Sequence, residues 1–402
     1  MLTPFETELD HLRSAGLYRT LRLIESVQGP EVTIDGRSVL LFCSNDYLGL
    51  ANHPEVIQAS IEATERFGTS SGASRLISGN MTLHEELERK VAQFKGTESA
   101  VVFSSGYMTN LGVIPSLIGE KDLIVADKLN HASLIDGCRL SGAVFRIYPH
   151  KNLKRLRELL GKRKQYRRAV IVTDSVFSMD GDIAPIPELL EIAQKYDAWL
   201  LIDEAHATGV LGKHGRGSLE HFNLSPNGHL IQMGTFSKAL GSFGGFIAGS
   251  KNLIAYLKNT ARTFFYSTSL PPGVLAASIK AVEIIDKEPE RLKNLWKNVA
   301  RFKNGMKEVG ARGVYPERSR RAVPLPDSET PIIPILTGEN ERTLKLAEEL
   351  FKNGVFVPAV RPPTVAKGKC RLRFTVMATH TKKQIEQCLE RVEEIIGKER
   401  NC

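Results

Sequence analysis

The clearest structural signal in the chain lies at residues 198–249, which read AWLLIDEAHATGVLGKHGRGSLEHFNLSPNGHLIQMGTFSKALGSFGGFIAG. Three apolar runs in this segment are AWLLID (198–203), LIQMG (230–234) and GGFIAG (244–249). Strands that are apolar throughout are buried on both faces, as in a mostly parallel sheet covered by helices. We therefore expect three strands of such a sheet here.

Similar runs lie upstream of this segment: SAVVF (99–103), DLIVA (122–126) and AVIVTD (169–174). Helical patterns separate them, and two more helical patterns, at 53–67 and 80–95, come first. Strands that alternate with helices indicate an α/β domain in which helices cover both faces of the sheet. The predicted fold class is thus α/β, with a large domain built on a mostly parallel sheet.

The pattern changes after Pro271. Two long helical patterns cover 272–309, and PIIPIL (331–336), VFVPAV (355–360) and CRLRFTV (370–376) read as strands next to further helices. This order is typical of a small α+β domain. We expect three parts, listed in chain order: an N-terminal arm at 1–45, a large domain at 46–270, and a small C-terminal domain with a linking helix at 271–402.

Composition narrows the class of protein. The chain has 402 residues, of which 42% are hydrophobic and 25% charged, as in ordinary globular proteins. No apolar run approaches the ~18 residues of a membrane span, and the N-terminus does not read as a secretory signal. The five cysteines form no CxxC pair, so we expect reduced thiols in a cytoplasmic protein without a membrane partner.

Positive charge gathers in one segment. The net charge is +9, and residues 151–168 contain nine basic residues and one acidic residue. Leucines at helical spacing predict an amphipathic helix with a solvated basic face. The alternative is a docking surface for an acidic partner or a phosphorylated ligand, in the extreme a basic binding protein without catalysis. Aromatic residues do not alternate with the basic ones, so we expect no nucleic acid partner.

A second basic segment, residues 315–326, carries Arg318, Arg320 and Arg321. It reads as a surface insertion. The alternative is a surface that favours a phosphorylated ligand.

Chemistry-bearing residues follow the predicted strands. Lys238 lies in the turn GTFSKALGSFGG (234–245), whose glycines allow another backbone or a flat ligand to approach closely. Asp203 ends its strand and His206 follows, while Ser104-Ser105-Gly106-Tyr107 and His131 come after two others. Ligands of open α/β sheets bind at the carboxyl ends of the strands. A lysine, a carboxylate, imidazoles and a helix N-terminus together predict a site for pyridoxal 5′-phosphate (PLP).

Other chemistries lack their required context. Asp203 to His206 spell DEAH, but no GxxxxGK[ST] phosphate loop accompanies them. The chain has neither an HExxH sequence nor a paired-cysteine motif, so we expect no metal site.

Eight ordered segments resemble the α-oxoamine synthases, which are PLP enzymes of the aspartate-aminotransferase fold. The segments are SNDYLGL (44–50), SGASRLISGNMTLHEELE (71–88), LNHASLIDG (129–137), DSVFSMDGD (174–182), IDEAHATGVLGKHGRG (202–217), TFSKALGSFGG (235–245), YSTSLPP (266–272) and RPPTVAKGKCRLRFT (361–375). The resemblance spans nearly the whole chain.

The resemblance implies a role for each site residue. Lys238, Asp203 and His131 are the implied catalytic residues: Lys238 forms the Schiff base and moves the Cα proton, Asp203 holds the pyridinium nitrogen, and His131 stacks on the ring. The implied cofactor-binding residues also include Gly106, Tyr107, Ser178, His206, Thr235 and Thr268, of which Thr268 reaches a neighbouring subunit's phosphate. The implied substrate-binding residues are Arg19, Asn45, Thr364 and Arg373 together with His131. Arg373 is the expected carboxylate clamp, with Arg371 as the alternative.

Within this family, the segments RPPTV (361–365) and SGASRLISGN (71–80) resemble the branch that condenses L-alanine with a pimeloyl thioester in biotin synthesis. The implied partners are therefore L-alanine, pimeloyl-CoA or a pimeloyl-carrier protein, and a second copy of the chain in a homodimer. The alternative is a glycine-using acyltransferase such as 2-amino-3-oxobutyrate ligase.

Overall fold

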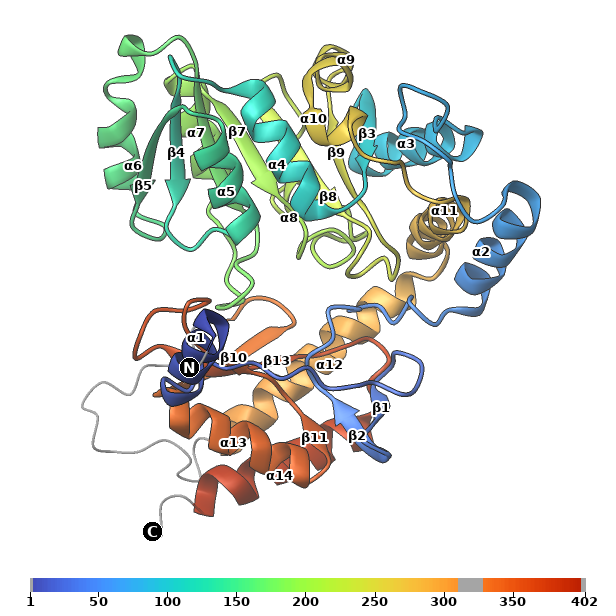
Figure 1. Ribbon diagram of the computed structural model, residues 1–402, viewed down its shortest axis with the longest axis vertical. Coiled ribbons are helices and arrows are strands. Elements are labelled where there is room, and N and C mark those ends of the chain that lie inside the picture. The colour runs from blue at the N-terminus through green and yellow to red at the C-terminus, as the bar shows by residue number, and fades with distance from the viewer. Residues whose placement is uncertain (1–2, 310–327, 399–402) are drawn as a thin grey trace. The chain divides into compact units, whose positions relative to one another are not determined.

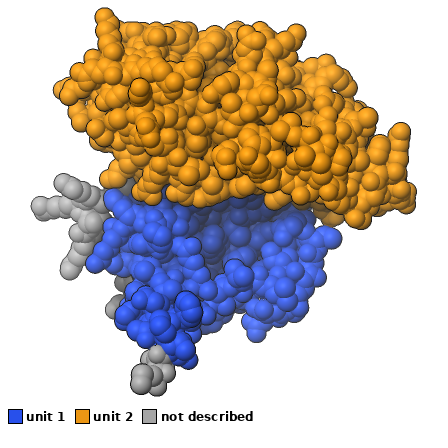
Figure 2. Space-filling view, turned by 45° about the horizontal axis from the view of Figure 1, so that its top comes forward, with its two compact units in different colours: residues 1–47, 179–182, 293–402 blue, residues 48–178, 183–292 orange. Residues whose placement is uncertain are grey.

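The computed structural model describes residues 3–309 and 328–398, and these form two compact units (Figure 2). One unit contains residues 1–47, 179–182 and 293–402, and we call it the small unit; the other contains residues 48–178 and 183–292, and we call it the large unit. The basic segment 315–326 lies outside the described residues. The domain boundaries expected from the sequence stay predictions.

A seven-stranded sheet forms the centre of the large unit (Figure 1). Its order is β3-β9-β8-β7-β6-β4-β5, and β9 alone runs against its neighbours. The strands are β3 (Ser99–Phe103), β4 (Leu123–Asp127), β5 (Val144–Tyr148), β6 (Ala169–Asp174), β7 (Trp199–Asp203), β8 (Leu230–Thr235) and β9 (Gly245–Gly249). The predicted mostly parallel α/β sheet is confirmed, and β5 is a strand that the sequence reading missed.

Helices cover both faces of this sheet. One face packs against helices α4 (Gly106–Leu117), α5 (Ala132–Leu140), α9 (Lys251–Thr260) and α10 (Arg262–Phe265). The other packs against α6 (Leu153–Leu160), α7 (Ile186–Lys195) and α8 (Ser218–His221). All six residues of β6 are buried, because both faces of a central strand are covered. Hydrophobic burial of this kind holds the strand ends in fixed positions.

Three more helices pack together beside the sheet in the large unit. They are α2 (Pro54–Phe67), α3 (Thr82–Lys95) and α11 (Pro272–Lys287). Helix α2 begins with His53 as its cap and Pro54 in its first turn, as the His-Pro pair predicts. Helix α12 (Pro289–Val309) contributes residues to both units.

The small unit has two three-stranded sheets. One joins β1 (Glu31–Ile34), β2 (Arg37–Leu41) and β11 (Val355–Phe356); the other joins β10 (Ile332–Gly338), β13 (Cys370–Thr375) and β12 (Ala359–Val360). Helices α1 (Pro4–Ser14), α13 (Asn340–Lys352) and α14 (Lys382–Lys398) complete it. The prediction of one strand at 355–360 is wrong: Pro358 separates two short strands that join different sheets, because proline cannot donate a ladder hydrogen bond.

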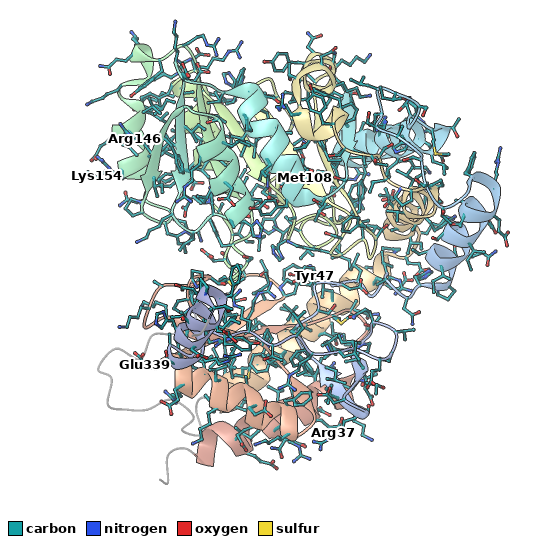
Figure 3. All side chains as sticks on the ribbon, in the orientation of Figure 1. Arg37, Tyr47, Met108, Arg146, Lys154 and Glu339 are labelled. Carbon is teal, nitrogen blue, oxygen red and sulfur yellow. The ribbon has the colours of Figure 1, made fainter. Side chains whose placement is uncertain are left out.

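The basic segment 151–168 forms a shorter helix than predicted. Helix α6 ends at Leu160, and a 3-10 turn (Arg163–Gln165) follows. Leu156 and Leu160 are buried against the sheet, so the predicted amphipathic pattern is confirmed. Figure 3 shows Lys154 on this helix and Arg146 on the edge strand β5 pointing outward, on the side of the unit away from Met108 of α4.

Every helix among the described residues is too short or too polar to cross a lipid bilayer.

Candidate active site

The carboxyl end of the large unit's sheet brings Lys238 and His206 together. Lys238 lies in the turn after β8 and His206 in the turn after β7, two neighbouring parallel strands. Lys238 Nζ lies 2.8 Å from His206 Nε2, and the His206 side chain is buried. An imidazole can accept or donate a proton near neutral pH, so His206 is a suitable proton-exchange neighbour for the Lys238 amine.

Asp203 ends β7 and is 3% exposed. Its Oδ1 accepts the backbone N–H of Ala205 at 2.9 Å, and its Oδ2 accepts the Asn110 side-chain N–H at 2.8 Å. Two donors to the ionised form stabilise a carboxylate that burial alone would neutralise. The strand end therefore carries a buried carboxyl group whose two oxygens are both hydrogen-bonded.

His131 caps helix α5, and its surroundings tend to keep the ring neutral. Its Nδ1 accepts the backbone N–H of Ser133 and lies 2.8 Å from Ser133 Oγ. Although the side chain is exposed at one side, desolvation by the surrounding protein lowers the pKa of His131, and the positive charge of Lys238 lowers it further. The nearby charge of Asp203 acts in the opposite direction.

Helix α4 begins at this end of the sheet. Ser105 caps it, and its Oγ accepts the Met108 N–H at 3.2 Å. The first N–H groups of a helix have no intrahelical acceptor, so such an end binds phosphate. A Cβ on Gly245 would clash with Thr109 Oγ1 and lie 2.8 Å from Gly106 Cα, so a glycine at 245 is needed for the close approach of β9 and α4. The predicted helix start at Gly106 and the predicted close approach at the glycine-rich turn are confirmed.

Thr235 and Tyr107 lie on either side of that helix end. Thr235 is buried, and its Oγ1 donates to the Gly244 carbonyl at 2.6 Å and lies 2.8 Å from Ser237 Oγ. Tyr107 is 42% exposed, and its hydroxyl bonds the Asp136 carboxylate. Its ring meets the His131 ring edge-on, with centroids 6.4 Å apart.

Two expected cofactor residues lie outside this group of contacts. Thr268 is exposed and forms a bridge with Ser74, on the segment before α3. Ser178 is half-buried at the end of the segment that follows β6.

The expected substrate residues lie in the small unit, where they form two pairs. Arg19 Nη2 lies 3.5 Å from Thr364 Oγ1, and Arg373 Nη2 lies 3.3 Å from Asn45 Oδ1. The alternative clamp, Arg371, is 2.6 Å from a carboxylate oxygen of Asp180, within the same unit. Arg371 is thus bound to an acidic side chain of its own unit.

The sequence reading missed three polar residues of the site, namely Asn110, Ser133 and Asp174. Asn110 bonds both Asp203 and Ser133, and Asp174 accepts the His131 backbone N–H at 2.7 Å. Asp174 ends a strand just as Asp203 does, so the strand-end rule could have found it. For Asn110, the only indication in the sequence was a polar amide side chain within an otherwise largely apolar helix, which is a weak signal.

The donor set fits PLP. An amine can bind the aldehyde, a buried carboxylate can hold the ring nitrogen, and a glycine-started helix can hold the phosphate. The Oδ1 of Asn110 is buried and has no hydrogen-bond partner among the described residues, so polar capacity remains beside Asp203.

Comparison with known proteins gives the family. The model for class I and II aminotransferases matches residues 37–392. The 8-amino-7-oxononanoate synthase of Geobacter sulfurreducens is 47% identical and covers 98% of this chain and 97% of its own length. The chain belongs to this synthase family. The Bacillus subtilis 8-amino-7-oxononanoate synthase 1 is 44% identical, with 96% of both chains covered.

Solved structures agree with this family. Serine palmitoyltransferase of S. paucimobilis, solved with a bound PLP–myriocin adduct, has a TM-score of 0.89 at 30% identity and covers 99% of this chain and 97% of its own. The 8-amino-7-oxononanoate synthase of Francisella tularensis has a TM-score of 0.75 at 29% identity, with 90% and 99% covered. The predicted PLP-dependent transferase fold is confirmed, and the chain is a PLP-dependent enzyme.

Proposed function

We propose that the chain condenses L-alanine with a pimeloyl thioester to give 8-amino-7-oxononanoate, CO₂ and the free thiol. The observation that carries this is the 44–48% identity, over nearly the full length, to synthases of that name. The same relatives favour the alanine-using branch over the glycine-using alternative. When bound, PLP supplies an electron sink that stabilises a carbanion at the amino acid Cα.

Lys238 is proposed to hold the cofactor aldehyde and then to move the Cα proton on its Nζ. This work requires an amine that is neutral for part of the cycle. The 2.8 Å contact with His206 Nε2 supports the proposal, because a neutral imidazole can accept a proton from the amine, whereas an ionised carboxylate would favour the charged ammonium form.

Asp203 is proposed to keep the cofactor ring nitrogen protonated. Its two N–H donors favour the ionised carboxylate that this task requires, against the opposing effect of burial. His131 is proposed to stack on the ring face, and His206 and Ser178 to bind near the phenolic oxygen.

The phosphate is proposed to bind at the start of α4, near Gly106, Tyr107 and Thr235. Free N–H groups and the positive end of the helix dipole both favour an anion there. Thr268 is proposed to reach the phosphate bound by the partner subunit, which its exposure allows.

Arg373 is proposed to bind the alanine carboxylate, and Asn45, Arg19 and Thr364 to bind the substrates nearby. A planar guanidinium matches a carboxylate with two parallel hydrogen bonds. Arg371 is assigned a structural role, because its guanidinium already forms an ion pair with Asp180.

A homodimer is proposed as the functional form. The large unit has a groove of about 350 Å³ between α2 and α11, and its lining includes Ile57, Ile61 and Phe243, which are 42%, 45% and 53% exposed. Exposed apolar surface of this kind is typical of an interface with another chain. A cytoplasmic location is proposed because Cys43, Cys138, Cys370 and Cys388 are free thiols.

A substrate matrix tests the proposed function. Purified holoenzyme is given L-alanine, glycine or L-serine with pimeloyl-CoA, a pimeloyl-carrier protein or acetyl-CoA, and thiol release is measured. We expect the highest kcat/KM with L-alanine and a pimeloyl donor. A preference for glycine with acetyl-CoA would move the assignment to the glycine-using branch, and the two pimeloyl donors identify the carrier.

A further inference from the structure

A buried chain of hydrogen bonds joins His131 to Asp203. His131 Nδ1 lies 2.8 Å from Ser133 Oγ, Asn110 Nδ2 lies 2.9 Å from the same oxygen, and Asn110 Nδ2 lies 2.8 Å from Asp203 Oδ2. Ser133, Asn110 and Asp203 are 1%, 0% and 3% exposed. Water does not reach these three residues freely, so each hydrogen in the chain must point to a protein acceptor.

The direction of the chain is set at Asp203. An ionised carboxylate can only accept, so the amide of Asn110 must turn its nitrogen toward Asp203. The opposite orientation would place two oxygens 2.8 Å apart with no hydrogen between them. In the observed orientation, Asn110 Oδ1 is buried and has no hydrogen-bond partner among the described residues. The Asn110 amide thus donates one N–H to Asp203 and the other to Ser133, while its oxygen has no partner among the described residues.

The same logic passes from Ser133 to His131. Because Ser133 Oγ accepts an N–H from Asn110, its own hydrogen points to another acceptor, and His131 Nδ1 is the acceptor at 2.8 Å. The backbone N–H of Ser133 also points to Nδ1, at 3.3 Å. Two donors directed at Nδ1 leave no room for a hydrogen on it. A neutral His131 therefore carries its hydrogen on Nε2.

We propose that Asn110 and Ser133 are positioning residues that couple the ionised Asp203 carboxylate to the neutral Nε2–H form of His131. The proposal rests on the proposed function for its purpose: a neutral imidazole can lie against a positively charged cofactor ring without repulsion. Protonating His131 on Nδ1 would set this hydrogen against the backbone N–H of Ser133. It would also turn the Ser133 hydroxyl hydrogen away from Nδ1, while its oxygen still faces the Asn110 N–H. Both Ser133 donors therefore oppose that change.

The charged groups that face His131 come from several elements. Asp203 on β7 and Asp136 on α5 favour the imidazolium, whereas Lys238, in the turn after β8, opposes it. Asp174 at the end of β6 binds the His131 backbone N–H, and its own pKa is raised by burial and by the charge of Asp203. Desolvation is the largest influence, and the pKa of His131 is lowered overall. This balance agrees with a neutral ring.

Nitrogen NMR of the holoenzyme tests the coupling directly. With ¹⁵N-labelled histidine and the His131→Asn variant for assignment, we expect wild-type His131 to show a bare Nδ1 and a protonated Nε2 at neutral pH. Ser133→Ala and Asn110→Ala should each raise the His131 pKa by roughly one unit, as expected for one lost hydrogen bond. Ser133→Thr keeps the hydroxyl and should restore the wild-type value.

Ser141→Ala is the matched control, since Ser141 caps the other end of α5. Its Oγ donates to the Cys138 carbonyl at 2.7 Å and accepts the Ala143 N–H at 3.1 Å, and neither residue belongs to the His131 network. We expect it to leave His131 unchanged. A hydrogen on Nδ1 of wild-type His131 would overturn the proposal even if no variant folds. A wild-type His131 pKa in both Ser133→Ala and Asn110→Ala would overturn it as well. The NMR measurement needs bound PLP but no turnover. A failure of the alanine reaction would therefore contradict the proposed function without affecting the test of the His131 coupling.

Discussion

Asp174 and Asp203 are register partners at the ends of β6 and β7, and both side chains are buried. Burial and the negative charge of Asp203 raise the pKa of Asp174 well above its usual range. Asp203, in contrast, accepts hydrogen bonds from Asn110 and Ala205 that stabilise its ionised form. Asp174 therefore has a raised pKa beside a carboxyl group whose two oxygens both accept N–H groups.

This difference predicts unequal effects of the same substitution. Asp203→Asn should lower kcat by about 10²-fold or more, because it removes a fixed charge from the cofactor site. Asp174→Asn should keep kcat within several-fold, since an amide imitates the protonated carboxyl and can still accept the His131 N–H. Steady-state kinetics on both purified variants checks this. Equal losses in the two variants would contradict the division of roles.

Substitutions of the two arginines of β13 should also have different effects. Arg373→Lys should raise the KM for L-alanine about 10- to 100-fold, because a point charge cannot replace a bidentate guanidinium. Arg371→Lys should lower the melting temperature with little change in KM, since Arg371 holds Asp180 and the Met179 carbonyl. The measurement is KM and thermal unfolding for both variants. A large KM change in Arg371→Lys alone would make Arg371 the carboxylate clamp.

The burial of His380 should lower the free energy of unfolding in acid. Burial lowers its pKa to about 4 from 6.5, while Nδ1 accepts the Met377 N–H and the ring stacks on Phe42. Because the folded pKa lies below the unfolded one, its stabilising effect is full above pH 6.5. The effect falls as the pH drops from 6.5 to about 4, by about 3 kcal/mol in total.

Urea unfolding at pH 7 and pH 4.5 measures this effect. The His380→Gln variant should lose less free energy of unfolding between the two pH values than the wild type. His11→Gln, at an exposed histidine of α1, is the control and should behave like the wild type. An identical pH dependence in all three proteins would contradict the assignment to His380.

Glu204, the residue after Asp203, forms a buried ion pair. Lys95 Nζ lies 2.5 Å from Glu204 Oε2 with both side chains fully buried, and Ser218 N–H donates to the other Glu204 oxygen at 2.9 Å. Lys95→Met alone should reduce the free energy of unfolding by about 3–5 kcal/mol, because it leaves Glu204 charged and unpaired. The double change Lys95→Met with Glu204→Gln should recover part of this loss.

A double-mutant cycle with chemical denaturation gives the coupling energy of this pair. The exposed pair Arg155–Glu158 is the matched control and should give at most about 1 kcal/mol. Strict additivity of the Lys95 and Glu204 changes would refute the proposed coupling.

Local chemistry explains what the sequence predicted. Apolar runs and the turns that follow them are readable from neighbouring residues, so β7 with Asp203, β8 with Lys238 and the start of α4 at Gly106 were predictable. Strand β5 was missed because it is an edge strand on which Arg146 and Ile147 are exposed, so no continuous apolar run marks it.

Long-range packing explains what the sequence did not predict. Asn110 acquires its role only when α4 packs beside α5 and β7, which brings Ser133 and Asp203 within reach. Gly181 similarly lies against Ile332, and Thr330 Oγ1 donates to its carbonyl at 2.8 Å, so residues 179–182 belong with the small unit. Contacts between residues 23 to 149 positions apart leave no local pattern in the sequence.

Isotope tracing with L-alanine labelled with ¹³C in the carboxyl group tests the central claim most directly. With a pimeloyl thioester, we predict that holoenzyme releases ¹³CO₂, free thiol and unlabelled 8-amino-7-oxononanoate in equal amounts, and that Lys238→Ala releases none of them. Retention of the label in a product, or release of thiol without CO₂, would contradict the decarboxylative condensation.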